Sequence, residues 1–376
     1  DPVGIKPLLW ARRDGVTLFA SELKAFDEDW HSEVELFPPG HYWTPEEGLS
    51  RFHHVVPPDL THDWDPPDGA GAAPPEAMVE AVRGQLVAAV EREMMADVPV
   101  GVFLSGGLDS SVVAAIAARR LAEEGEALQT FAVGTEQSPD LLAAREVAEF
   151  LGSSHHERIY EPHELEAVLP DVIRAIESYD PSLVRSALPN YLLAEMTSQH
   201  VKVVLTGEGA DELFAGYEYV RAIDDHGELH TELVRTISEL HSLNLQRADR
   251  VTMAHGLEAR VPFLDLDMVA FALSLPPEWK MTPPGEQEKK LLRKAFEGWI
   301  PDSILWRKKA QFGDGSGARG ALDRSQDGKS EEELHAAVEP EPGGARSDEE
   351  RRYLETYRRF YPRAVPEQTM SLFATT

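Results

Sequence analysis

Three stretches of this sequence concentrate glycine, serine, acidic residues and lysine at spacings that suit phosphate chemistry. The first is Ser105-Gly106-Gly107-Leu108-Asp109-Ser110, which follows the short apolar run Val100–Leu104. Glycine lets the backbone approach an anion closely, and the N–H groups at a helix start favour negative charge. The serine hydroxyls can add hydrogen bonds, and Asp109 can hold Mg²⁺. The stretch predicts a phosphate-binding turn, although it lacks the lysine of a Walker A loop; an ordinary strand–turn–helix connection is the alternative.

The second stretch, which begins Thr206-Gly207-Glu208-Gly209-Ala210-Asp211-Glu212, follows the apolar run Val201–Leu205. It places three carboxylates within five residues, a costly arrangement unless a cation neutralises them. Because ligands bind at the carboxyl ends of parallel strands, we expect this turn to lie beside the first one. In so acidic a chain, a solvated acidic turn is the alternative.

The third stretch is basic: six of the ten lysines fall between Lys280 and Lys309. An ammonium group is a compact point charge that suits phosphate. A solvated basic helix face around Glu288–Lys294 is the alternative explanation.

The elements around these stretches alternate between strand and helix. From residue 76 on, apolar runs alternate with segments of helical spacing, which predicts an α/β fold with a doubly wound parallel sheet and helices on both faces. The strands expected here are Val100–Leu104, Leu128–Val133, Ile159–Tyr160 and Val201–Leu205, and the helices are 78–90, Ser110–Leu121, Leu141–Leu151, Leu165–Ile176, Ala187–Met196 and Asp348–Tyr361. Short runs at Ile5–Ala11, Thr17–Ala20 and His41–Trp43 predict a β segment over residues 1–58. The expected divisions are 1–58, a Pro-rich linker 59–75, a main domain 76–313, and an acidic, mobile segment with a last helix over 314–376.

Composition narrows the class of protein. The formal net charge is −30, from 66 acidic and 36 basic residues. Such a charge disfavours partners made of nucleic acid or anionic membrane. The excess of carboxylates over lysines predicts a halophilic protein, and an acidic soluble protein without adaptation to salt is the alternative. There are no cysteines, so thiolate chemistry is excluded. Neither a membrane-spanning run nor a signal peptide is evident, so a cytoplasmic enzyme is expected. The adjacent pairs His53-His54 and His155-His156 would point to opposite faces of a strand and make no metal site.

The three stretches resemble motifs of one known family. The first is similar to the pyrophosphate-binding (PP) loop of the ATP pyrophosphatase superfamily. The second resembles the S-G-E-G-S-D-E-x-F-x-G-Y stretch of asparagine synthetase, with Thr206 and Ala210 in place of serines. Residues 288–293 and 305–312 resemble its E-K-x-x-L-R and W-R-x-K-x-Q-F motifs, although Ala310 stands where Glu is frequent. Residues 247–250 and 258–265 resemble the helix and turn below the synthetase site.

The resemblance implies a site for ATP and Mg²⁺ in an adenine nucleotide α-hydrolase-like fold. The residues matching its nucleotide-binding positions are Leu104, Ser105, Gly106, Gly107, Asp109, Ser110, Val133, Thr206, Gly207 and Glu208. Asp109 and Asp211 match the metal ligands. The residues expected to serve catalysis are Glu208, Lys289, Lys309 and Arg185.

The resemblance also implies a reaction. Aspartate would be amidated through β-aspartyl-AMP, with release of AMP and pyrophosphate and with ammonia that the intact enzyme draws from glutamine. Residues 1–58 resemble the end of the family's N-terminal-nucleophile glutaminase domain, which uses a cysteine that this chain lacks. A truncated sequence is favoured over a separate glutaminase subunit, and a homodimer stays open. The alternatives are an amidotransferase or β-lactam-synthetase-like enzyme acting on another carboxylate, or a nucleotide-binding regulatory protein without turnover.

Overall fold

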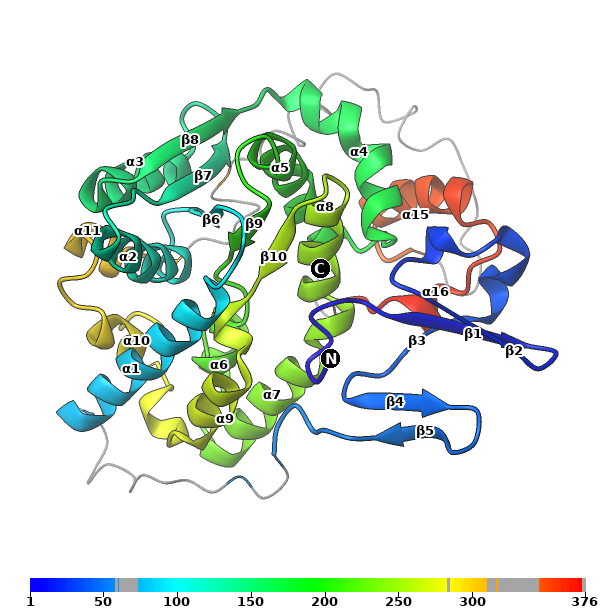
Figure 1. Cartoon of the computed structure of the whole chain (residues 1–376), viewed down its shortest axis with the longest axis horizontal. Helices are drawn as coiled ribbons and strands as arrows, with labels where there is room; N and C mark the ends of the chain where they lie inside the picture. Colours follow the sequence, from blue (N-terminus) through cyan, green and yellow to red (C-terminus); the bar gives the residue numbers. More distant parts are fainter. Residues whose placement is uncertain (58–59, 61–73, 283–284, 310–315, 317–344, 374–376) are drawn as a thin grey trace.

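A five-stranded parallel sheet forms the centre of the protein (Figure 1). The computed structural model describes residues 1–57, 60, 74–282, 285–309, 316 and 345–373. The predicted linker 59–75 falls mostly outside these residues, as does the acidic segment up to residue 344. The strands run in the order β10-β9-β6-β7-β8, with the bounds β6 Val100–Phe103, β7 Gln129–Gly134, β8 Ser154–Ile159, β9 Val203–Leu205 and β10 Glu258–Arg260.

The strand order reverses between β6 and β9, which are neighbours in the sheet but about a hundred residues apart in the chain. The chain starts at β6 in the middle, moves outward through β7 and β8, and returns to place β9 on the other side of β6. Val102 of β6 pairs with Leu205 of β9, so the two strands end level with each other. A doubly wound sheet binds its ligands at such a switch point. The two predicted turns leave the sheet at this place.

Helices cover both faces of the sheet, and the alternation of side chains along β7 shows why. Phe131 and Val133 belong to one hydrophobic core, and Ala132 between them belongs to the other. The first core holds α4, α5, α8 and α15, whereas the second holds α1, α2, α3, α9 and α10. The predicted fold class is therefore confirmed. The helix bounds are α1 Glu76–Glu93, α2 Leu108–Glu123, α3 Pro139–Leu151, α4 Pro162–Ile176, α5 Pro181–Thr197, α6 Ala210–Leu213, α7 His226–Glu239, α8 Asn244–Met253, α9 Leu266–Ser274, α10 Lys290–Ala295, α11 Asp302–Leu305, α15 Asp348–Phe360 and α16 Pro366–Thr369.

Two predicted elements were wrong because polar strands lie at the sheet edges. β8 covers Ser154–Ile159, where only Ile159 had been assigned to a strand, and its residues Ser-His-His-Glu-Arg lack an apolar run. Residues 258–260 form the opposite edge strand β10 rather than a turn. In addition, α5 begins at Pro181, six residues before the predicted start, with the Asp180 carboxylate accepting from the Leu183 N–H at 3.0 Å.

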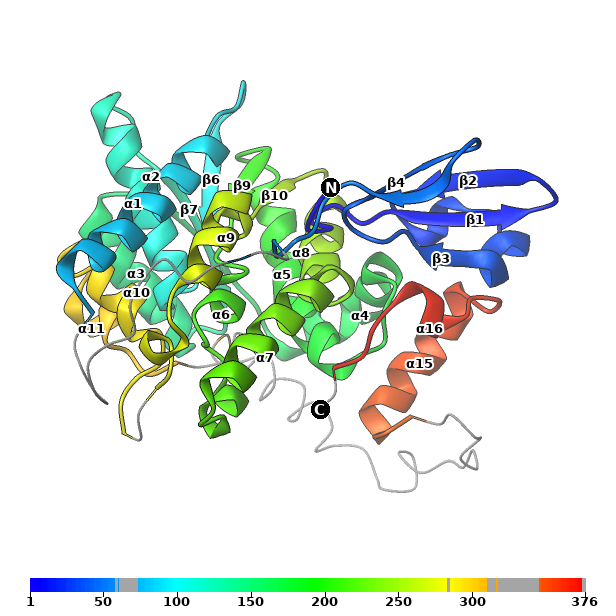
Figure 2. The ribbon, with the colours of Figure 1, turned by 90° about the horizontal axis from the view of Figure 1, so that it is seen from below.

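The N-terminal segment forms two small antiparallel sheets beside the main body (Figure 2). One has the order β2-β1-β3, with β1 Leu9–Arg13, β2 Val16–Ala20 and β3 Val34–Leu36; the other pairs β4 His41–Thr44 with β5 Gly48–Arg51. The Lys6 ammonium contacts the Asp249 carboxylate of α8 at 2.6 Å. The backbone N–H groups of Leu23 and Lys24 donate to the buried Glu177 carboxylate at 2.8 and 2.9 Å. The segment is thus anchored to the main body through charged groups. Among the described helices, none combines the length and apolar character that crossing a bilayer requires.

The excess of negative charge leads to a prediction about salt. Carboxylates are rarely buried unpaired, so most of the net charge of −30 lies at the surface. These charges repel over ~30 Å at ~0.01 M salt but only ~3 Å at ~1 M. We expect the melting temperature to rise between about 0.1 M and about 2 M KCl, measured by circular dichroism. A melting temperature that stays flat or falls contradicts the halophilic interpretation.

Candidate active site at the β6–β9 switch point

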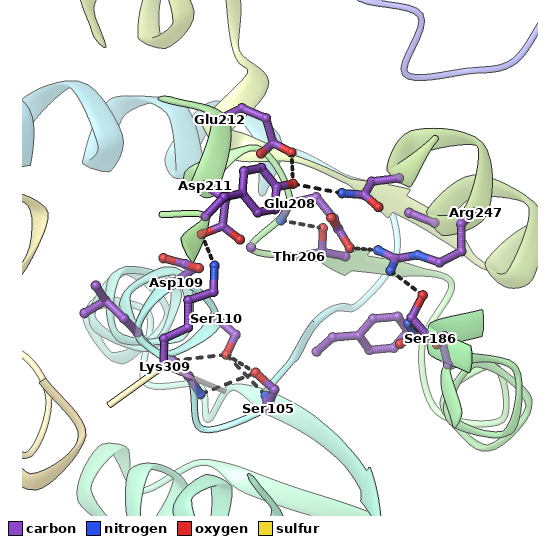
Figure 3. A pocket seen from close by; sticks show the side chains of 18 of the residues that line it. Ser105, Asp109, Ser110, Ser186, Thr206, Glu208, Asp211, Glu212, Arg247 and Lys309 are labelled. Carbon is purple, nitrogen blue, oxygen red and sulfur yellow. Dashed lines mark hydrogen bonds and ion pairs between the residues drawn. The ribbon is translucent and has the colours of Figure 1, made fainter. Parts of the chain in front are cut away.

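A pocket of about 830 Å³ opens at the carboxyl ends of β6, β7 and β9. Its walls come from the two predicted turns, from α5 and α8, and from the basic stretch (Figure 3). The predicted site residues that line it are Leu104, Ser105, Gly107, Asp109, Ser110, Val133, Arg185, Thr206, Gly207, Glu208, Asp211, Lys289 and Lys309. Gly106 is not among the lining residues, and its carbonyl accepts a hydrogen bond from Arg307 at 3.2 Å. Residues from four distant parts of the sequence therefore meet in one cavity.

The first turn has the shape of an anion-binding loop. The Ser105 and Ser110 hydroxyls lie 3.0 Å apart, and the Gly107 N–H donates to the Ser105 hydroxyl at 3.3 Å. Gly106 has a φ of 70° and packs so closely that an added Cβ would lie 2.5 Å from the Cβ of Ala143, which requires glycine. The 16-residue helix α2 begins at Leu108, two residues earlier than predicted, so Asp109 lies in its first turn. Its unpaired N–H groups and dipole favour a phosphate at this end.

The second turn packs directly against the first. A Cβ on Gly207 would lie 2.9 Å from both the Cβ of Asp109 and the backbone nitrogen of Ser110. Only a glycine allows this close approach, which brings Asp211 and Asp109 to the same side of the pocket. Thr206 is buried, and its backbone N–H donates to the Arg260 carbonyl at the end of β10. The edge strand that the sequence did not reveal therefore supports the second turn.

Two lysines neutralise the paired carboxylates. The Lys289 ammonium lies 2.6 Å from Asp109 Oδ2 and 2.5 Å from Asp211 Oδ1. The Lys309 ammonium contacts Asp211 and donates to the Gly216 carbonyl at 3.0 Å. Lys289 is only 2% exposed and has a φ of 57°, an unusual conformation for lysine. The solvated basic face considered for this stretch is wrong for Lys289, which is buried inside the site, and for the buried Glu288 and Arg293.

The charges in this cluster shift the pKa values in opposite directions. Burial raises the pKa of Asp211, but the two ammonium groups outweigh burial and hold it below its ordinary value. Burial raises the pKa of Asp109, and the neighbouring Asp211 charge adds to this effect although Lys289 opposes it. For Lys289, burial lowers the pKa, but the carboxylates of Asp109 and Asp211 raise it by more than burial lowers it. The ammonium therefore stays charged. The site therefore holds two acidic groups of unequal basicity beside a fixed cation.

The residues present fit a divalent cation bound together with phosphates. The Asp109 Oδ1 atom is buried and accepts no hydrogen bond from any residue in the described part of the chain. It therefore has lone pairs free for a cation. Among the described residues, no group of three or more His, Cys, Asp or Glu side chains surrounds one point. Two carboxylates without a full protein cage are typical of Mg²⁺, which takes its other ligands from water and substrate phosphates.

Glu208 and two arginines form the opposite wall. The Glu208 carboxylate contacts the guanidinium of Arg247, which also donates to the Ser186 hydroxyl at 2.8 Å (Figure 3). Burial raises the pKa of Glu208, while Arg247 opposes this shift. Arg185 lines the same wall, and its guanidinium lies 3.3 Å from the Glu349 carboxylate of α15. Because burial raises its pKa, the Glu208 carboxylate is more basic than an exposed one, which suits a group that accepts a proton.

Sequence reasoning missed several charged residues of the pocket, among them Arg247, Asp140 and Arg307. All three lie in stretches that had been noted, but only for packing or for neighbouring residues. The one signal that could have found Arg247 is its place in the run Arg247-Ala248-Asp249-Arg250, which is too charged for a buried helix without partners. Lys280, Lys290 and Lys294 do not line the pocket. The predicted contacts of Ala310, Gln311 and Phe312 lie outside the described residues.

The fold and the pocket together define an α/β protein with a phosphate-binding loop and a carboxylate pair at its switch point. A family model described as asparagine synthase matches residues 81–226 and 221–356. The chain therefore belongs to the asparagine synthase family. It is 38% identical over 396 residues to "Asparagine synthetase [glutamine-hydrolyzing] 3" of Arabidopsis thaliana, covering 98% of this chain and 65% of that protein. It is 39% identical to "Asparagine synthetase [glutamine-hydrolyzing] 1" of Saccharomyces cerevisiae, covering 84% of this chain and 61% of the relative.

The chain spans less than two thirds of the length of these relatives. Among solved structures, the NMN synthetase from Francisella tularensis is similar at 15% identity, with a TM-score of 0.34 and coverage of 81% of this chain and 100% of that chain. A similarity this distant adds no weight to the functional argument.

Proposed function

We propose that this chain carries out the ATP-dependent step of asparagine synthesis. ATP would react with the side-chain carboxylate of aspartate to give β-aspartyl-AMP and pyrophosphate, and ammonia would then displace AMP. The observation that supports this most is the cluster of Asp109, Asp211, Lys289 and Lys309 at the meeting point of the two turns. Family membership supports aspartate as the acid and ammonia as the nucleophile.

In this mechanism the first turn holds the departing pyrophosphate. The N–H groups at the start of α2 and the hydroxyls of Ser105 and Ser110 would bind its oxygens, and Lys289 and Lys309 would stabilise the charge that develops there. Asp109 and Asp211 would hold Mg²⁺, which withdraws charge from the phosphates. Val133, at the end of β7, would meet the adenine through its backbone, beside Leu104.

The second half of the reaction uses the opposite wall. Ammonia reaches the acyl carbon as a neutral nucleophile, and a proton must leave the nitrogen when the amide forms. Glu208 is suited to take this proton because burial raises its pKa. We assign Arg185 to the acid substrate, whose second carboxylate a guanidinium can bind through two parallel hydrogen bonds.

An assay that compares ammonium with glutamine as the nitrogen source tests the proposed function. We expect repeated pyrophosphate release and asparagine formation by the purified chain with ATP, Mg²⁺, aspartate and ammonium. When glutamine replaces ammonium, we expect no asparagine and no pyrophosphate release beyond a single turnover, because nothing displaces AMP from the acyl-adenylate. The reason is that the sequence has no cysteine to supply the thiolate that a glutaminase of this type needs. Pyrophosphate is measured in a coupled assay, and asparagine by chromatography.

The control experiment varies the acid substrate. Glutamate, N-acetylaspartate and a β-amino acid replace aspartate in parallel reactions with ammonium. Faster release with one of these acids would identify a related amidating or ring-closing enzyme instead. Asparagine formation from glutamine with no second protein present would overturn the expectation for this chain.

A further inference from the structure

An ion pair at the start of α3 lies in the pocket wall without a role in the steps described above. The Asp140 side chain is only 8% exposed, and its Oδ1 accepts from Arg307 Nη2 at 2.8 Å. The other guanidinium nitrogen, Nη1, donates to the Gly106 carbonyl at 3.2 Å. A single guanidinium therefore joins the phosphate-binding turn to the first turn of α3.

Arg307 also controls the course of the chain that carries Lys309. Helix α11 ends at Leu305, and residues 307–309 belong to no helix or strand. Two side chains fasten this short piece: Arg307 at the first turn and Lys309 at Asp211 and the Gly216 carbonyl of the second turn. Only Lys308 separates them. The position of the Lys309 ammonium thus depends on the contacts that fix Arg307.

The connection between β7 and α3 also forms a hydrogen bond with Ser316, a residue later in the chain than Arg307. The Ser316 carbonyl accepts from the Thr135 N–H at 3.2 Å and from the Tyr160 hydroxyl at 2.9 Å. Ser316 is fully buried there. The chain is therefore attached to the first turn of α3 at Arg307 and to the connection just before α3 at Ser316.

The energetics favour a positioning role over one in stability alone. A buried carboxylate loses hydration, and its attraction to one partner frequently does no more than offset this loss. The geometry is specific, because a guanidinium can serve a carboxylate and a carbonyl at once, whereas an ammonium has no fixed fork. Arg307 uses this fork to fix the distance between two parts of the phosphate site.

We propose that Arg307, held by Asp140 and by the Gly106 carbonyl, is a positioning residue that places the Lys309 ammonium for binding the ATP phosphates. The inference rests on the proposed function, since it assigns Lys309 to ATP. It adds two residues, from α3 and from the piece after α11, whose effect on the reaction passes through Lys309.

A double-mutant cycle between positions 307 and 309 tests this dependence. The variants are Arg307→Ala, Lys309→Ala and the double variant, and the measurements are the MgATP Kd by calorimetry and kcat for pyrophosphate release. We expect Lys309→Ala to lower kcat roughly 100-fold, as removal of one transition-state donor does, and Arg307→Ala to lower it roughly 10-fold. Because Arg307 acts through Lys309, the double variant should match Lys309→Ala within about two-fold in both kcat and Kd.

Two further variants separate positioning from folding. Arg307→Lys keeps the charge but can serve only one of the two acceptors, so its kcat should fall between wild type and Arg307→Ala. Asp140→Asn should lower kcat like Arg307→Ala and leave the KM for aspartate within about two-fold, because its effect passes to the phosphate end of the pocket. The matched control is Glu157→Gln, which breaks the two-point ion pair with Arg145 on the exposed side of the same helix. Its kcat and Kd should equal those of wild type.

The outcomes are distinct. Multiplied losses of roughly 1000-fold in the double variant would show that Arg307 contacts the phosphates itself, and would overturn the positioning role. Wild-type values in Arg307→Ala would overturn it as well. Pyrophosphate release that does not depend on any acid would defeat the proposed function, while the cycle in MgATP affinity would still decide the inference. A wild-type chain that fails to bind ATP would overturn both.

Discussion

Asp109→Asn and Asp211→Asn are each expected to reduce pyrophosphate release at least about 10³-fold, which corresponds to ~4 kcal/mol of transition-state stabilisation. The carboxylates share the Lys289 ammonium at 2.6 and 2.5 Å, and Asp109 Oδ1 has no hydrogen-bond partner among the described residues. An amide of the same shape removes the charge that holds a divalent cation. Steady-state kinetics over a range of MgCl₂ concentrations measure the effect, and the apparent KM for Mg²⁺ should rise in both variants.

The fold should survive either substitution, because Lys289 keeps one carboxylate partner in each variant. Circular dichroism and the melting temperature check this. The control is Asp267→Asn, since the Asp267 side chain is 75% exposed and lies at the start of α9 away from the pocket. Near-normal turnover in either active-site variant would remove that residue from the metal site. Loss of the folded state would instead assign the carboxylate pair to stability.

Much of this site was predictable because the chain marks it locally. Each turn follows a short apolar run, and in a parallel sheet the carboxyl ends of strands share one edge. The sequence alone therefore predicted that Asp109 and Asp211 would lie together, and the structure places both on Lys289. The alternation of strand and helix after residue 76 likewise predicted the two-faced α/β architecture.

The rest depends on contacts between residues far apart in the chain. The edge strands β8 and β10 are polar, so no apolar run distinguishes them from loops. Lys289 is buried only because carboxylates about 80 and 180 residues earlier in the chain neutralise it. Arg307 gains its importance from a backbone carbonyl that it meets only in the fold. Such partners leave no periodic signal in a single sequence.

Breaking the ion pair between Arg250 and Glu177 is expected to cost more stability than breaking any surface pair. Both side chains are 1% exposed, and the guanidinium also donates to the Ile176 carbonyl at 3.1 Å. The Glu177 carboxylate accepts the N–H groups of Leu23 and Lys24 as well. One buried carboxylate therefore joins α8 to the N-terminal β segment.

Arg250→Met should lower the free energy of unfolding by ~3–5 kcal/mol, because it leaves the buried Glu177 carboxylate with only the more distant Lys24 ammonium, at 3.7 Å, as a cationic partner. Glu177→Gln should cost a similar amount, since it leaves the guanidinium buried and unpaired. Their combination should cost ~1–3 kcal/mol less than the sum, because neither residue is then left as a lone charge. Urea denaturation monitored by tryptophan fluorescence measures all three.

A matched exposed pair separates burial from charge. Arg120→Met breaks the contact of Arg120 with Glu124, whose side chains are 38% and 50% exposed, and should cost less than about 1 kcal/mol. In Arg250→Met, hydrogen exchange at the Leu23 and Lys24 amides should also accelerate, because their acceptor is then free to move toward water. If Arg250→Met costs no more than Arg120→Met and these amides keep their protection, the hydrogen bonds and packing around Glu177 hold the N-terminal segment in place without the guanidinium.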